Sequence, residues 1–293
     1  MLKGRLGLAA ARVPHADRHG LLWLGRGNLL VEDGTLRFAT AGYEELPAGD
    51  YAIPYQMVSS FILEPGTSIT HDALRILARH GCTVLIVGEG AVRYYASLPS
   101  GPGRSAMARR HAELWSDSSL RQEVILQLYE WRLGERLEVR DLNALRGIEG
   151  VRVKESYRQI AKQYGIRWRA RRYDRSDPEA ADRPNRALHH AAAAVKAAAM
   201  TAVAASGALP ELGFIHEDAS IAFPLDIADL YREEVTLPIA FGAVQQFEED
   251  PEQSLERLVR KRAVKVLRQQ KLVAKMIDRI QELLGPELRS GTR

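Results

Sequence analysis

A histidine and two aspartates with the spacing of a metal site lie near residue 220. His216 follows the apolar run Gly213-Phe214-Ile215, and Asp226 comes ten residues later. A helix that begins at Pro224 places Asp226 and Asp229 on one face. The segment 217–219 predicts a turn into a second apolar run, 220–223, so the imidazole can return beside the carboxylates. One nitrogen and several hard oxygens suit Mg²⁺ or Mn²⁺ better than a structural zinc.

The same three residues also fit a purely structural role. An aspartate near a helix N-terminus is favoured by the helix dipole alone. A single histidine beside apolar residues is usually a satisfied structural one. The sequence of this segment by itself therefore leaves both interpretations open.

Glu149 is a further candidate, because it falls on the apolar row of a predicted helix from Leu145 to about Tyr164. The row continues at Val153, Tyr157, Ile160 and Tyr164, and Glu149 stands one turn upstream of it. A carboxylate that faces a core needs a cation or a metal beside it, or it becomes protonated. Alternatively, Gly150 breaks the helix and Glu149 is only a cap.

An arginine-rich segment follows this helix. It contains Arg167, Arg169, Arg171, Arg172 and Arg175, with the aromatic residues Trp168 and Tyr173 between them. A guanidinium group binds phosphate oxygens through two parallel hydrogen bonds, and an exposed aromatic ring can stack on an unpaired base. The segment predicts nucleic-acid binding. The alternative is a solvated loop with salt bridges to Asp174, Asp177 and Glu179.

Two different halves must position these residues. Residues 1–96 have mostly strand patterns, with a hairpin at Asp33-Gly34 and one helix over 71–80 that Thr70 can cap. Residues 97–104, rich in Pro and Gly, predict a linker. Residues 105–293 have long helical patterns, ending in a basic amphipathic stretch, 252–284, that suits DNA, a partner or, less well, a membrane surface. The fold class is α+β multidomain: a small N-terminal β-rich domain followed by a larger all-helical catalytic domain.

Bulk properties exclude several protein classes. Apolar residues make up 46% of the 293-residue chain and charged residues 27%, as in ordinary globular proteins. The net charge is +4 and the sequence pI about 9.2, so the positive charge is clustered more than general. A single cysteine, Cys82, excludes an intramolecular disulfide. We expect no signal peptide, no membrane-spanning segment and a cytoplasmic location.

Together these residues carry a resemblance. The chain resembles the CRISPR-associated integrases, the Cas-one (Cas1) endonucleases of spacer acquisition, and looks most like subtype I-E. The matching segments are 63–67, 87–89, 92–93, 145–150, 161–165, 171–174, 213–216 and 226–229. They cover most of the chain in order and with similar spacing.

The resemblance implies a ligand set, DNA contacts and partners. Glu149, His216 and Asp229 match the residues that hold a divalent metal, Mg²⁺ or Mn²⁺, and Asp226 matches an accompanying catalytic aspartate. Arg75 and Arg93 match DNA-contacting residues of the β domain, and Arg171 and Tyr173 match a basic-aromatic segment near the catalytic site. The implied partners are DNA (protospacer and CRISPR repeat), a second copy of the chain and a small Cas-two (Cas2) dimer. Ser68 and Lys196 depart from the subtype pattern, where an arginine and a tyrosine stand.

The function that these features predict is metal-assisted phosphoryl transfer, in which a DNA 3′-OH is joined into a CRISPR array. Asp226 can orient a metal-bound water or act as a base. A nuclease that uses water on branched or single-stranded DNA would need the same residues. A DNA-binding scaffold without catalysis is the third hypothesis.

Overall fold

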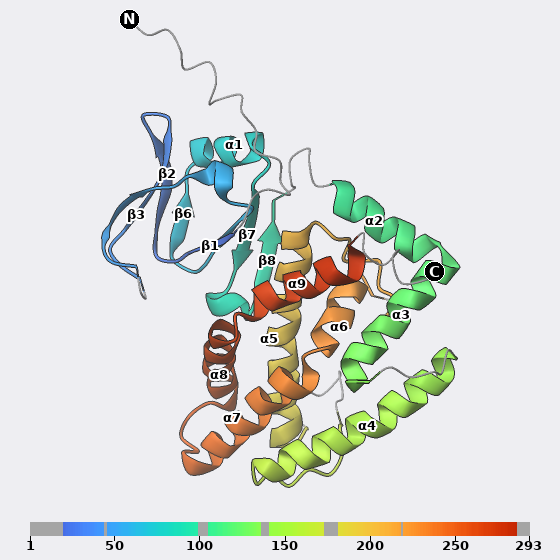
Figure 1. Ribbon diagram of the computed structural model, residues 1–293. Coiled ribbons are helices and arrows are strands. Elements are labelled where there is room, and N and C mark those ends of the chain that lie inside the picture. The colour runs from blue at the N-terminus through green and yellow to red at the C-terminus, as the bar shows by residue number, and fades with distance from the viewer. Residues whose placement is uncertain are drawn as a thin grey trace, which may run out of the picture. The chain divides into compact units, whose positions relative to one another are not determined.

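The computed structural model describes residues 20–43, 46–98, 105–135, 141–172, 181–217 and 219–285. The chain forms two compact units (Figure 1). The first unit runs to Gly88 and resumes at Tyr95, and the second holds Glu89–Tyr94 and the chain from Met107. The first is β-rich and the second helical, which confirms the predicted fold class. The expected linker lies mostly outside the described residues, and the short segment Glu89–Tyr94 groups with the helical unit.

The first unit contains two four-stranded sheets. One sheet has the order β1-β5-β7-β8, and the other has the order β4-β3-β2-β6. The strands are β1 (Leu21–Leu24), β2 (Gly27–Glu32), β3 (Thr35–Thr40), β4 (Gly49–Ala52), β5 (Ser60–Leu63), β6 (Thr67–Ile69), β7 (Thr83–Val87) and β8 (Tyr94–Ser97). Pairs β1–β5, β5–β7 and β2–β6 are parallel, whereas β2–β3 and β3–β4 are antiparallel.

Local sequence signals explain this unit well. The β2–β3 hairpin turns at Asp33 and Gly34, both with positive φ, as a tight two-residue turn requires. Helix α1 (His71–Arg79) begins at Thr70, whose hydroxyl accepts a hydrogen bond from the Ala73 N–H. Both predictions are confirmed. The core between the elements is apolar and includes Leu29, Leu36, Phe38, Phe61, Leu77 and Val84.

The second unit is a helical assembly around α5 (Arg183–Ser206). Helices α6 (Ala222–Asp229), α7 (Leu237–Glu249), α8 (Leu255–Gln269) and α9 (Leu272–Leu284) pack against α5, as Figure 1 shows. Alanine-rich surfaces permit this close approach, and 13 residues of α5 are buried. Helices α2 (Ser105–Ser116), α3 (Ser118–Leu133) and α4 (Leu142–Gln163) follow one another, and α4 contacts both α3 and α7.

Three boundaries differ from the sequence prediction. Helix α6 begins at Ala222, two residues before Pro224. Proline is tolerated there because the N–H groups of the first turn have no acceptor within the helix. The C-terminal amphipathic stretch is two helices, broken where Lys271 takes a positive φ. Helix α4 begins three residues earlier than Leu145, capped by Asp141. None of the described helices is long and apolar enough to cross a bilayer.

Candidate active site

The carboxylate of Asp226 organises the segment that carries His216. Asp226 is fully buried on α6. Its Oδ2 accepts the N–H groups of Phe214 and Ile215 at 2.7 and 3.1 Å, and its Oδ1 accepts the N–H of His216 at 3.1 Å. The same Oδ1 lies 2.7 Å from His216 Nδ1. Asp226 therefore fixes both the backbone and the ring of His216, and Nε2 lies 3.8 Å from Asp229 Oδ2.

Helix α2 holds the same segment from the other end. The His111 ring is fully buried and donates from Nε2 to the carbonyl of Leu212 at 2.8 Å, while its Nδ1 accepts from the Leu209 N–H at 3.2 Å. Trp115 Nε1 donates to the carbonyl of Gly213 at 3.0 Å. A Cβ at position 213 would lie 2.1 Å from the His216 carbonyl oxygen, so only glycine fits there.

His111 provides a stability prediction. Burial lowers its pKa to about 4, so the folded protein keeps it neutral while the unfolded chain protonates near pH 6.5. Its contribution is fully present above pH 6.5 and is lost as pH falls toward 4, by about 3 kcal/mol in total. We expect the unfolding free energy of His111→Gln, which keeps a donor and an acceptor, to fall less between pH 6.5 and 4 than that of the wild-type protein. Denaturant unfolding between pH 7 and 4 measures it, and parallel curves for the two proteins would contradict the assignment.

Glu149 lies inside the helix that the sequence predicted. Helix α4 runs unbroken through Gly150, so the alternative of a helix break there is wrong. The Glu149 side chain is mostly buried, and its partner is Arg132 from the end of α3, at 2.9 Å from Oε1. Glu149 therefore has a cationic partner beside it, as expected for a carboxylate on the apolar row of a helix.

Two arginines join Glu149 to Asp229. Arg132 Nη2 lies 3.3 Å from Asp229 Oδ2, and the Arg132 side chain is only 4% exposed. Arg232 Nη2 lies 2.6 Å from the same oxygen, and its Nη1 lies 3.7 Å from Glu149 Oε1. The four side chains form what we name the ion-pair quartet: Glu149, Asp229, Arg132 and Arg232.

A π-helical turn, η5 (Arg232–Thr236), follows α6 and carries Arg232 into the quartet. The N–H groups of Val235 and Thr236 both donate to the carbonyl of Tyr231, at 3.0 and 3.1 Å. Pro238 lies in the first turn of the next helix and has no N–H to continue the regular pattern. Such π turns occur often at functional sites because they shift the side-chain register.

The charges of the site reinforce one another. The hydrogen bond that His216 Nδ1 donates to the Asp226 carboxylate raises the pKa of His216 above its ordinary value. Burial opposes ionisation of Asp229, but Arg132 and Arg232 outweigh it and lower the pKa of that carboxyl. Burial likewise disfavours the Arg232 cation, and Asp229 outweighs it, so the pKa of Arg232 is raised. Asp229 and Arg232 are therefore both charged in the folded protein.

Two of the three expected ligands lie close enough together to share a hard divalent ion, and guanidinium groups lie among the donors. His216 Nε2 and Asp229 Oδ2 are 3.8 Å apart, within the span of about 4.2 Å that one ion with ligands near 2.1 Å can bridge. A carboxylate that accepts a hydrogen bond from one ring nitrogen is the usual support for a histidine that binds a metal through the other nitrogen. Within the described ranges, no three His, Cys, Asp or Glu side chains are already placed to hold an ion. Glu149 reaches the other two donors only through the arginines.

A cavity of about 410 Å³ opens beside the quartet. Its wall includes Arg132, Glu149, Asp229 and Arg232, together with Trp131, Arg152, Ser156 and Glu233. Arg152 is bound to Glu135 and to the carbonyl of Leu133, so it does not contact the quartet. The cavity gives a ligand much larger than an ion access to the quartet, but His216 and Asp226 are not part of its wall.

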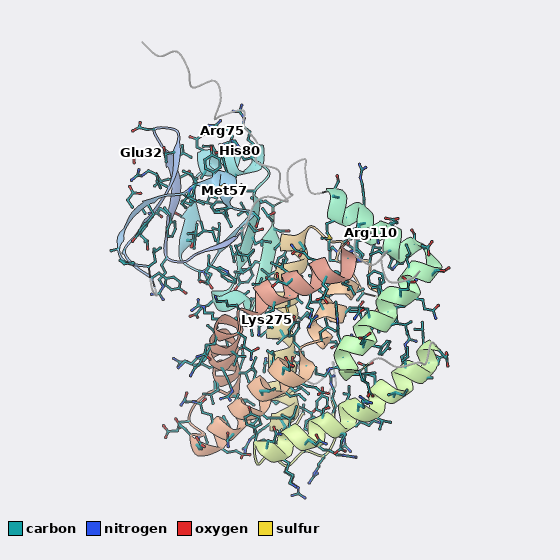
Figure 2. All side chains as sticks on the ribbon, viewed as in Figure 1. Glu32, Met57, Arg75, His80, Arg110 and Lys275 are labelled. Carbon is teal, nitrogen blue, oxygen red and sulfur yellow. The ribbon has the colours of Figure 1, made fainter. Side chains whose placement is uncertain are left out.

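The expected DNA contacts are placed as exposed cations. Arg75 is an exposed residue of α1 (Figure 2) and donates from Nε to Asp72 Oδ1 at 3.1 Å. Arg93, in the Glu89–Tyr94 segment, lies 3.6 Å from Glu256 of α8. The remaining predicted contacts, Arg167, Arg169, Arg171 and Arg172, are exposed, and no described carboxylate lies within ion-pair distance of them. Tyr173 lies outside the described residues.

One ring of the arginine-rich segment points inward. Trp168 stacks on Tyr157 at a centroid distance of 5.1 Å and meets Phe241 edge-on at 5.5 Å. It therefore anchors the segment to α4 and α7 and is not a free surface for a base. Asn185, buried on α5, bonds the carbonyl of Ala170 and the N–H of Arg172 and fixes the same segment.

Sequence reasoning missed the two arginines of the quartet and His111. Arg232 carries a signal, since it stands three residues after Asp229, the spacing of a helical ion pair. Arg132 and His111 carry none, because their partners lie far away in the chain.

Comparison with known proteins gives the family. The chain is 37% identical over 276 residues to a CRISPR-associated endonuclease Cas1 of Geobacter sulfurreducens, covering 93% of this chain and 87% of that one. It is 34% identical to the Escherichia coli protein of that name, with the same coverage. A solved TtCas1–DNA complex superposes with a TM-score of 0.82 at 35% identity, covering 92% of this chain and 98% of the other.

No family-level sequence profile matches the chain. The pairwise relatives nevertheless span nearly its whole length at more than 30% identity, and the fold match covers 92% of the chain. The chain belongs to the CRISPR-associated Cas1 endonuclease family.

Proposed function

We propose that this protein joins the 3′-OH ends of short foreign DNA into a CRISPR array by divalent-metal-assisted phosphoryl transfer. The observation that carries the proposal is the convergence of His216 Nε2 and Asp229 on one point, with Glu149 held nearby by the same two arginines. Family membership and the DNA bound to the related TtCas1 support DNA as the substrate.

The donors suit Mg²⁺ or Mn²⁺, with Glu149, His216 and Asp229 as ligands. When bound, such an ion stabilises charge on phosphate oxygens and increases the acidity of an attacking hydroxyl. In the neutral His216 ring, Asp226 keeps the proton on Nδ1 and so leaves the lone pair of Nε2 for a metal. Arg132 and Arg232 place positive charge beside the reacting phosphate.

Asp226 is better suited to positioning than to proton transfer. Both of its oxygens already accept hydrogen bonds, from three backbone N–H groups and one imidazole. A general base needs a lone pair directed at the hydroxyl that it deprotonates. We therefore assign Asp226 to holding His216, and leave the attacking hydroxyl to the metal site.

An assay with Mn²⁺ and a DNA duplex with free 3′-OH ends tests the function. Joined strands support the integrase, and cleavage without joining supports the nuclease alternative. Binding with neither product supports the non-catalytic scaffold. Repeating the assay with and without a Cas-two dimer, and sizing the protein alone, tests the expected partner and the expected homodimer. Subtype I-E, the domain limits 1–96 and 105–293 and the cytoplasmic location stay predictions.

The exposed arginines give a separate DNA-binding prediction. Arg169→Ala should weaken DNA binding about equally for all sequences and reduce the slope of log affinity against log salt by about one, because one phosphate contact is lost. Arg158→Ala is the matched control, since Arg158 is an exposed arginine of α4 paired with Glu155. Fluorescence anisotropy over a salt series measures both slopes. Equal slopes for wild type and Arg169→Ala would remove Arg169 from the DNA contacts.

A further inference from the structure

The ion-pair quartet is electrically balanced without a metal. Its two carboxylates, Glu149 and Asp229, face two guanidinium groups, and each guanidinium lies within 4 Å of both carboxylates. All four side chains are at least three-quarters buried, so solvent screens their charges poorly. The two guanidinium groups thus neutralise the carboxylates, as a bound divalent metal would.

A divalent ion alone would disturb this balance. If the ion binds Glu149 and Asp229 while both arginines stay, the site gains two uncompensated positive charges. If the arginines leave, two buried guanidinium groups lose their partners, which is strongly unfavourable. Either way the ion binds weakly unless new negative charge arrives with it.

DNA phosphate can supply that negative charge. The wall of the cavity beside the quartet holds Arg132, Arg152 and Arg232 together with five carboxylates, so a phosphodiester that enters it along with the ion meets the guanidinium groups that the ion would displace. Guanidinium groups bind phosphate oxygens as readily as carboxylate oxygens, with the same paired geometry. The exchange leaves every charge with a partner.

We propose that Arg132 and Arg232 occupy the cation position of the DNA-free protein, and that they make the divalent ion and DNA bind cooperatively by moving from the carboxylates to DNA phosphate. The proposal rests on the proposed function, because it needs the same three ligands. In this proposal the two arginines make tight binding of the ion depend on the presence of DNA.

Mn²⁺ binding, followed by the electron paramagnetic resonance signal of the free ion, tests the coupling. The DNA is a duplex with 3′-dideoxy ends, so that no joining occurs, and ion bound by DNA alone is subtracted. For the wild-type protein we expect DNA to lower the Mn²⁺ dissociation constant at least about tenfold, and Mn²⁺ to strengthen DNA binding by the same factor, as linkage requires. This arm needs no variant that could fail to fold.

Substitutions at Arg232 separate charge from shape. Without DNA, Arg232→Gln should bind Mn²⁺ at least about tenfold more tightly than wild type, because the ion no longer has to displace the Arg232 guanidinium. The further gain in Mn²⁺ affinity when DNA is added should then be much smaller than for wild type. Arg232→Lys, which keeps the charge but cannot contact both carboxylates with separate nitrogens, should lie closer to wild type than Arg232→Gln does. Arg152→Gln is the matched control: this arginine lines the same cavity and is bound to Glu135 and Leu133 instead.

The outcomes distinguish the coupling from the metal site itself. Mn²⁺ binding that is sensitive to Asp229→Asn but equal with and without DNA overturns the coupling alone. An Arg232→Gln protein that binds Mn²⁺ no more tightly than Arg152→Gln also overturns it. Mn²⁺ binding that Asp229→Asn leaves unchanged overturns the ligand set, and with it the proposed function.

Discussion

Replacing Asp229 by Asn should reduce strand joining at least about a hundredfold, more than the loss usual for an outer-shell residue of a metal site. The amide keeps the shape of the side chain but removes the charge that lies 3.8 Å from His216 Nε2. Mn²⁺ affinity should fall in parallel, because a neutral amide oxygen is a much weaker ligand for a hard cation. Single-turnover joining rates and an Mn²⁺ titration measure the two effects.

The same substitution should lower the free energy of unfolding of the metal-free protein by about 3 kcal/mol, since it leaves two buried guanidinium groups with one carboxylate. Asp278→Asn, at an exposed position on α9, is the control and should change neither the rate nor the stability appreciably. Full joining activity in Asp229→Asn would mean that the ligand set is wrong.

Replacing Asp226 by Asn should damage both the fold and the reaction. The amide offers one acceptor where four donors now converge, and its NH₂ group faces N–H groups. We expect a loss of about 3 kcal/mol in unfolding free energy, from buried donors left without acceptors. Joining should fall about 10- to 100-fold, as for other outer-shell partners of metal-bound histidines.

Asp250→Asn provides the comparison for Asp226→Asn. Asp250 also accepts a backbone N–H, from Glu252, but in an exposed turn where water replaces lost bonds. It should cost less than about 1 kcal/mol and leave joining intact. If Asp226→Asn lowers joining while stability and Mn²⁺ affinity stay at wild-type values, Asp226 takes part in proton transfer and the positioning role assigned here is wrong.

The sequence predicted the parts of the site that depend on local periodicity. Glu149 was recognisable because it interrupts an apolar helical row, and Asp226 and Asp229 because they share a helix face. The hairpin at Asp33-Gly34 and the Thr70 cap followed from turn and capping chemistry. In each case the pattern that gave the prediction lies within a short stretch of the chain.

The parts that could not be predicted depend on contacts between remote segments. Arg132 meets Asp229 across 97 positions, and His111 meets Leu212 across 101. No local pattern marks either residue. The π turn that brings Arg232 to Glu149 also lies outside regular periodicity, and the inward position of Trp168 depends on Phe241. These features determine whether the metal ligands are free or paired.

A crystal of the protein bound to DNA and grown with Mn²⁺ tests the central claim most directly, because anomalous scattering locates the ion without assumptions about its ligands. We predict one peak within about 2.3 Å of Glu149, His216 Nε2 and Asp229 together, with Arg132 and Arg232 turned from the carboxylates to DNA phosphate oxygens. A peak elsewhere, or an ion bound while Glu149 remains paired to Arg132, would contradict the account.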